Sequence, residues 1–167
     1  MRILFLIITS LIFTISSANN ISIEEVRNLF QKAAKEEVLC KKLIVSLQTY
    51  NENNNTSLAA YRACAIMMMA KYVVSPINKL SKFNEGKNLL EKCIEKDNKN
   101  VELHFLRFTI QSNAPKFLGY NSSLLLDKNF LLNALPTIND KQLKNIVTTF
   151  LKSSNYLTNT EKQKLIL

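Results

Sequence analysis

The chain has 167 residues, of which 47% are apolar and 21% charged, and its formal net charge is +9. This length suits one domain. Because it contains only two glycines and three prolines, it lacks the turn residues that a many-stranded sandwich or barrel needs. The composition therefore excludes those β architectures and predicts an all-α fold.

The positive charge comes almost entirely from lysine. Arginine occurs only at Arg2, Arg27, Arg62 and Arg107. Recognition of bases and phosphates favours the guanidinium fork of arginine over the lysine ammonium. Asparagine is also abundant, as in residues 53–55, which indicates a compositional bias of the chain. We therefore expect a solvated basic surface and no nucleic-acid partner.

Residues 1–18 have the pattern of a secretory signal peptide. Arg2 is followed by an apolar run over residues 3–15 and then by the small residues Ser16 and Ala18. We expect cleavage before Asn19, export to the periplasm or the exterior, and a mature single helical domain over residues 19–167. The alternative is an uncleaved membrane anchor, although the run is shorter than the roughly 20 residues that span a bilayer.

Apolar residues at helical spacing then predict about six helices in antiparallel hairpins. Ser22 and Glu25 form a capping-box pattern, so the first helix should begin at Ile23 and run to about residue 49. After a polar loop over residues 51–55, Thr56 or Ser57 is expected to cap a central helix, which is apolar nearly all round.

Pro76 predicts a break, and a third helix is expected to begin at Ser81. Ser122 or Ser123 and Asn139 or Asp140 are the predicted caps of the fifth and sixth helices. The helices from the second onward are expected over residues 58–74, 81–96, 101–111, 124–135 and 141–151, with a terminal turn in residues 160–167.

The three cysteines, Cys40, Cys64 and Cys93, form no Cys-x-x-Cys pair and carry no zinc or thiol-redox signal. Cys40 and Cys64 are equally distant from the loop near residue 52, and Cys64 and Cys93 from the turn near residue 78. Antiparallel helices advance equally per residue, so all three are expected in one layer of the stack. Three packed thiols, or a disulfide from Cys64 to either neighbour, fit this spacing better than a shared metal site.

Residues 89–102 read Leu-Leu-Glu-Lys-Cys-Ile-Glu-Lys-Asp-Asn-Lys-Asn-Val-Glu. This run resembles the junction between two tetratricopeptide repeats, with Asn98 in place of the usual turn proline. The small, bulky and small packing positions of that pattern are occupied by Gly86, Leu90 and Cys93. The resemblance covers about residues 83–107 and implies a short array of stacked helical hairpins. The whole chain also resembles small exported helical proteins of bacteria, which implies no activity.

Catalytic and cofactor motifs are missing from the sequence. The single histidine, His104, has no nucleophile elbow, H-E-x-x-H is absent, and two isolated glycines cannot form a phosphate loop. We therefore expect no cofactor and no metal. The acidic residues that could pair as catalytic carboxylates are expected to be solvated helix-surface groups; they are Glu91, Glu95, Asp97 and Asp127.

One polar constellation is a candidate binding site. Asn100, His104, Arg107 and Gln111 share one face of the predicted fourth helix, because they follow one another at spacings of four, three and four. Arg107 would hold a carboxylate, and Gln111 or Asn121 a peptide backbone, with the loop around Tyr120 closing beside them. The competing interpretation is an ordinary polar face beside a packed loop.

The expected function is that of a non-catalytic exported protein that binds a protein or peptide. The first alternative is an envelope structural protein held at the membrane by its uncleaved N-terminus. The second is a small enzyme that uses His104.

Overall fold

The computed structural model describes residues 21–165, and these residues form α-helices and short 3-10 turns with no strand. The all-α prediction is confirmed. The predicted signal peptide and its cleavage site lie outside the described residues.

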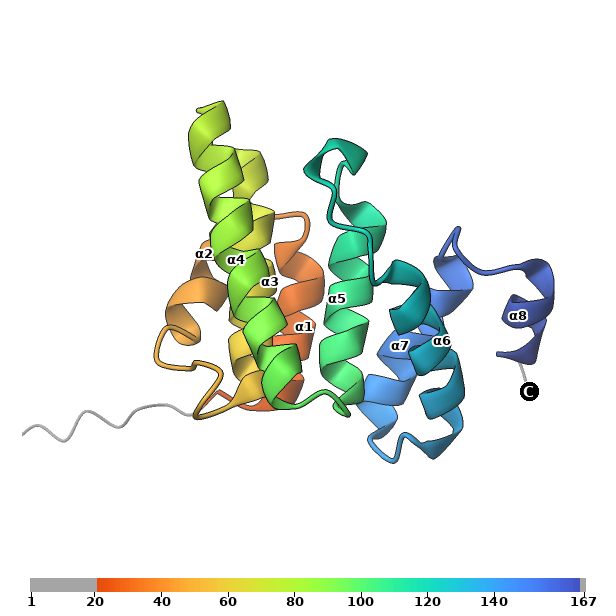
Figure 1. The fold of residues 1–167 in the computed structure, drawn as a ribbon. Helices are drawn as coiled ribbons and strands as arrows, with labels where there is room; N and C mark the ends of the chain where they lie inside the picture. Colours follow the sequence, from red (N-terminus) through yellow and green to blue (C-terminus); the bar gives the residue numbers. More distant parts are fainter. Residues whose placement is uncertain (1–20, 166–167) are drawn as a thin grey trace, which may run out of the picture.

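Within residues 21–165, eight α-helices stack roughly in chain order (Figure 1). α3 and α4 pack along each other, with α2 at one side of them and α1 drawn between α3 and α5, and α6 to α8 follow towards the other side. The bounds are α1 Ile23–Ala33, α2 Glu37–Ser46, α3 Thr56–Met69, α4 Pro76–Lys96, α5 Val101–Asn113, α6 Leu124–Ala134, α7 Lys141–Ser153 and α8 Asn159–Lys164.

The first predicted helix is wrong in its length, because the chain turns back after Ala33 and begins α2 at Glu37. Neither glycine nor proline marks this turn, and Glu36 provides no side-chain cap for α2. The turn instead allows Cys40 and Leu43 to be fully buried against the rest of the core. Tertiary packing therefore overrides the continuous helical pattern of the sequence.

The third predicted helix begins too late. Pro76 starts α4 and does not break it: proline at the first helical position lacks only an amide that would have no helical partner there. The preceding helix ends at Met69 and continues as the 3-10 turn η1 (Ala70–Tyr72). The terminal turn is α8, whose start is fixed by a capping box between Thr158 and Glu161.

Helix caps show which local signals are reliable. The Ser22–Glu25 capping box is present, and Asp140 caps α7 by accepting from the Leu143 amide. Asn55 caps α3 in place of Thr56 or Ser57, and Ser123 occupies the cap position of α6 without a side-chain cap bond.

The core runs through the whole stack, and the α3–α4 contact at its centre is unusually close. A Cβ atom on Gly86 would lie 2.9 Å from the Met67 amide nitrogen and closer still to the Ala63 carbonyl oxygen. Gly86 therefore permits the backbones of α3 and α4 to approach each other. Among residues 21–165 there is no helix with both the length and the apolar character needed to cross a bilayer.

Candidate functional site

The polar face of α5 is turned into the molecule. His104, Arg107 and Gln111 are all buried, so this face is a structural contact in the described fold and not an open surface for a ligand. Asn100, at the start of the same face, caps α5 by accepting from the Glu102 amide at 3.0 Å. The expectation of an accessible face is therefore corrected: α6 and α4 cover it.

Asp127 on α6 holds this face together. Its carboxylate accepts from Arg107 Nε at 2.7 Å and from the terminal Nη2 of Arg107 at 2.8 Å. Its Oδ1 atom also lies 2.7 Å from His104 Nδ1. The Asp127 side chain is 0% exposed, so three charge-assisted contacts replace the water that the carboxylate loses on folding.

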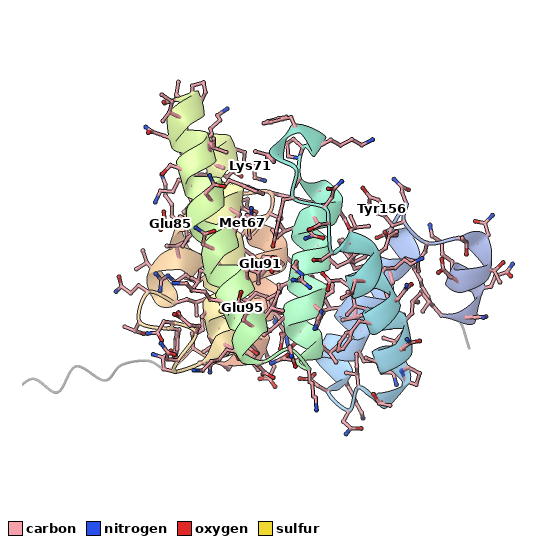
Figure 2. The ribbon with its side chains drawn as sticks, in the orientation of Figure 1. Met67, Lys71, Glu85, Glu91, Glu95 and Tyr156 are labelled. Atoms are coloured by element: carbon pink, nitrogen blue, oxygen red, sulfur yellow. The ribbon has the colours of Figure 1, made fainter. Side chains whose placement is uncertain are left out.

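The same group of charges extends to α4. Arg107 Nη1 lies 2.7 Å from Glu91, and Figure 2 shows Glu91 on the side of α4 that faces α5. The Tyr120 hydroxyl donates to the other oxygen of Glu91. We call these five residues the His104 cluster: His104, Arg107, Asp127, Glu91 and Tyr120.

Both ring nitrogens of His104 face oxygen acceptors. Nδ1 lies beside Asp127, and Nε2 lies 2.8 Å from the Asn98 carbonyl oxygen. Only the protonated ring donates from both nitrogens. Burial by itself lowers the pKa of His104, but the hydrogen bonds to Asp127 and Asn98 outweigh it and raise that pKa above its ordinary value. The ring also stacks on Phe130, with centroids 4.0 Å apart.

Asp127 corrects the expectation that the acidic residues are solvated. It lies on the buried stripe of α6 between Leu124 and Leu131, and this spacing of three and four residues is the signal that could have identified it. Glu91 is half-buried, whereas Glu95 is exposed, as expected.

A second buried group of charges lies around Arg27 on α1, which the sequence did not single out. Arg27 makes a bidentate contact with Glu102, with Nε–Oε1 2.7 Å and Nη2–Oε2 3.0 Å, and also contacts Asp140 at 2.7 Å. The Tyr61 hydroxyl donates to Glu102 at 2.7 Å. These contacts join α1, α3, α5 and the start of α7. We call this group the Arg27 cluster, and it stabilises the packing of these helices against one another.

The remaining predicted binding residues do not lie together in one site. Tyr120 is buried and packs edge-on against Phe83, with centroids 5.8 Å apart. Asn121 is exposed beyond it. Gln111 is buried, and both polar atoms of its amide lack a hydrogen-bond partner within residues 21–165. The structure thus brings His104, Arg107 and Tyr120 together but leaves Asn121 outside the cluster.

The three cysteines are free, buried thiols. Cys40 Sγ lies 3.2 Å from the carbonyl oxygen of Ala65, the residue after Cys64. Burial raises the pKa of Cys40 to about 11 and that of Cys93 to about 12. Burial, and then the neighbouring Cys93, raise the pKa of Cys64. Such thiols are protonated at neutral pH and therefore poor nucleophiles.

An open groove lies between α1 and α2, with a volume of about 790 Å³. Its apolar floor is formed by Ile21, Leu29 and Leu39, which are partly buried. The exposed lysines Lys32 and Lys42 lie on its rim. The polar side chains that complete the lining are Glu25, Asn28 and Ser46.

A smaller hollow of about 150 Å³ lies between the ends of α5 and α7, beside Tyr156 and Ser112. It is too small for a peptide segment. In the part of the chain that the structure describes, no three side chains of His, Cys, Asp or Glu are grouped so that they could hold a metal ion.

Comparison of the chain with protein-family models, with curated proteins and with solved structures gave no match.

Proposed function

We propose that this chain is a non-catalytic, exported interaction protein that holds a peptide segment of a partner protein in the groove between α1 and α2. The observation that carries the proposal is the groove itself, because it combines an apolar floor with exposed charges at its rim. Grooves between helices of this kind accept the apolar face of an amphipathic helix.

The charges at the rim define the partner's chemistry. Lys32 and Lys42 are exposed, whereas the Glu25 carboxylate already accepts from the Ser22 amide at 3.1 Å as part of the capping box. The groove therefore favours a segment with an apolar stripe flanked by Asp or Glu.

The arrangement of the interior polar groups supports a non-catalytic role. In the His104 cluster each charged group is matched by another within the protein, and both ring nitrogens of His104 are engaged. A general base needs a nitrogen that can reach the substrate's proton. Using His104 in this way would require the α5–α6 contact to open.

The resemblance of residues 83–107 to a tetratricopeptide-repeat junction also favours this proposal. The chain stacks helices roughly in chain order, and Gly86 lies at the close approach of α3 and α4, where the pattern expects a small residue. Stacked helical hairpins commonly present extended surfaces to peptides.

A charge-swap experiment tests the groove. The first probe is a fluorescein-labelled amphipathic helix with a stripe of leucines flanked by glutamates. The second probe has the same leucine stripe flanked by lysines. We expect Lys32→Glu/Lys42→Glu to weaken binding of the glutamate-flanked probe at least about tenfold, which corresponds to about 1.4 kcal/mol. The same variant should bind the lysine-flanked probe more tightly.

The matched control is Lys96→Glu/Lys99→Glu, which makes the same change of charge at the end of α4 and in the turn after it, and neither residue lines the groove. Both control residues are exposed. If this control changes the binding of the two probes as strongly as the groove variant, net charge and not the groove determines binding, and the proposal is wrong.

A further inference from the structure

One end of the stack exposes apolar side chains that neither the core nor the α1–α2 groove uses. Val74, in the turn between η1 and α4, is 93% exposed, and Ile77 in the first turn of α4 is 79% exposed. Phe117, in the 3-10 turn η2 (Lys116–Leu118), is 86% exposed, and Leu80 adds a fourth exposed apolar side chain. We call this end of the molecule the apolar-basic tip.

The two segments of the tip lie at the same end of the molecule. Tyr120, three residues after Phe117, packs against Phe83 of α4, and Lys87 Nζ lies 5.5 Å from the centroid of the Tyr120 ring. These contacts hold the η2 segment beside α4. Figure 1 shows η2 and the start of α4 at the upper end of the stack.

Lysines surround the apolar side chains of the tip. Lys71, Lys79, Lys82 and Lys116 are all exposed, and Lys71, labelled in Figure 2, lies where η1 meets α4. Residues 70–82 and 115–119 contain no Asp or Glu. The nearest carboxylate along α4 is Glu85, which pairs with Lys82 at 2.7 Å. The formal charges within these two segments are therefore all positive.

We propose that this tip docks on an anionic lipid bilayer. Val74, Ile77, Leu80 and Phe117 would enter the boundary between headgroups and acyl chains, and Lys79 and Lys116 would contact the lipid phosphates. Apolar residues at one end of a fold, surrounded by lysine, are the pattern of interfacial membrane binding. Lysine suits this position because its stem lies along apolar surface while its ammonium stays in water.

The chemistry of the tip favours lipid over the other anionic partners. Nucleic acids bind aromatic platforms and arginine, whereas three of the four apolar side chains here are aliphatic and all four cations are lysine. A protein partner would require a complementary surface across two separate segments. A bilayer accepts separate protruding side chains without such a surface.

The tip is remote from the start of the described chain. Lys71 Nζ donates to the carbonyl oxygen of Ala34, at the end of α1. The beginning of α1 therefore lies at the opposite end of that helix, about 16 Å away at 1.5 Å per residue. Membrane contact through the tip does not depend on the proposed groove.

The experiment uses the full chain, which contains no tryptophan. Phe117→Trp places one reporter at the tip, and Leu125→Trp places the matched control on α6, where Leu125 is also exposed. Vesicles of phosphatidylcholine with about 30% phosphatidylserine supply the anionic surface. We expect a blue shift and quenching by brominated acyl chains for Trp at position 117, and neither effect at position 125.

Charge variants complete the test. Lys79→Gln/Lys116→Gln should weaken vesicle binding about 25-fold, at about fivefold per lysine, and Lys96→Gln/Lys99→Gln at the other end of α4 should weaken it much less. The proposal is overturned if the vesicles leave the emission at position 117 unchanged, or if the two charge variants lose affinity equally. It is also overturned if the emission shifts only with an acidic protein in place of the vesicles.

Discussion

Asp127 is the residue that joins His104 and Arg107 in the His104 cluster. It is fully buried and receives hydrogen bonds from both Arg107 and His104. Its removal takes from Arg107 one of two carboxylate partners, the other being the half-buried Glu91, and takes from His104 the partner of Nδ1. Loss of one partner from a buried ion pair costs much more than loss of a surface pair.

We expect Asp127→Asn to lower the free energy of unfolding by about 3–5 kcal/mol, because the amide cannot compensate the charges of Arg107 and His104. Chemical denaturation monitored by circular dichroism measures this change. The control Glu95→Gln, at an exposed position of α4 (Figure 2), should stay within about 0.5 kcal/mol of the wild type. A loss below about 1 kcal/mol for Asp127→Asn would mean that the His104 cluster does not stabilise the fold as expected.

His104 should make stability depend on pH. Its pKa is raised in the fold, where hydrogen bonds to Asp127 and Asn98 outweigh the effect of burial. The protonated ring therefore contributes stability that is fully present below the unfolded-state pKa of about 6.5 and is lost as pH rises through the folded-state pKa.

Two measurements check this prediction. Because the chain has one histidine, its imidazole signals in an NMR titration are unambiguous and should report a pKa above about 6.5. The free energy of unfolding should fall above that pH in the wild type but not in His104→Gln. A pKa below 6.5 would show a neutral ring and a different hydrogen-bond arrangement.

At the scale of elements, the α3–α4 contact determines the middle of the stack. Gly86 lies within α4, where alanine would ordinarily be the better helix former by about 1 kcal/mol. The contact with the backbone of Ala63 and Met67 leaves no room for the added methyl group.

We therefore expect Gly86→Ala to destabilise the protein by about 1–3 kcal/mol, the usual cost of overpacking. Asn84→Ala, two residues earlier and exposed, gains helix propensity without a clash and should leave stability equal or higher. Thermal unfolding of both variants decides the question. A more stable Gly86→Ala would place α3 and α4 further apart than in this structure.

Local chemistry explains which elements were predictable. Ser22 with Glu25 marks the start of α1 correctly, and Asp140 that of α7, because a cap needs only residues within one turn. The α1–α2 turn has no such signal, and Pro76 is compatible with both a break and a helix start. Where the chain turns, and whether a proline ends or begins a helix, depends on packing against distant helices.

The candidate sites were less predictable for the same reason. The spacing of His104, Arg107 and Gln111 correctly placed them on one face, but a spacing does not show whether that face is buried. The partner of Arg27 is Glu102, 75 residues away in the sequence, and only the fold brings them together. The α1–α2 groove could not be anticipated, because a single uninterrupted helix was expected there.

At the scale of the whole molecule, the interior charges are used within the fold, while the groove and the apolar-basic tip present different chemistry to the outside. The groove combines its apolar floor with Lys32 and Lys42. The tip protrudes with Phe117 and Ile77. A protein with both surfaces would bring a partner peptide to an anionic membrane.

Export is the part of the proposal that depends on residues 1–18. The small residues Ser16 and Ala18 predict that the mature chain begins at Asn19. N-terminal sequencing of the protein recovered from the producing cells measures this directly. A chain that still begins at Met1 would favour the anchored envelope protein over the released one.

Mapping the peptide-binding surface by NMR tests the central claim most directly. The labelled protein is titrated with the glutamate-flanked amphipathic helix, and shifts of backbone amide signals are followed. The groove proposal predicts shifts concentrated in α1 and α2, around Leu29 and Leu39, with the amides of α5 and α6 unchanged. Shifts centred on His104 and Asp127, or no saturable shifts at all, would contradict it.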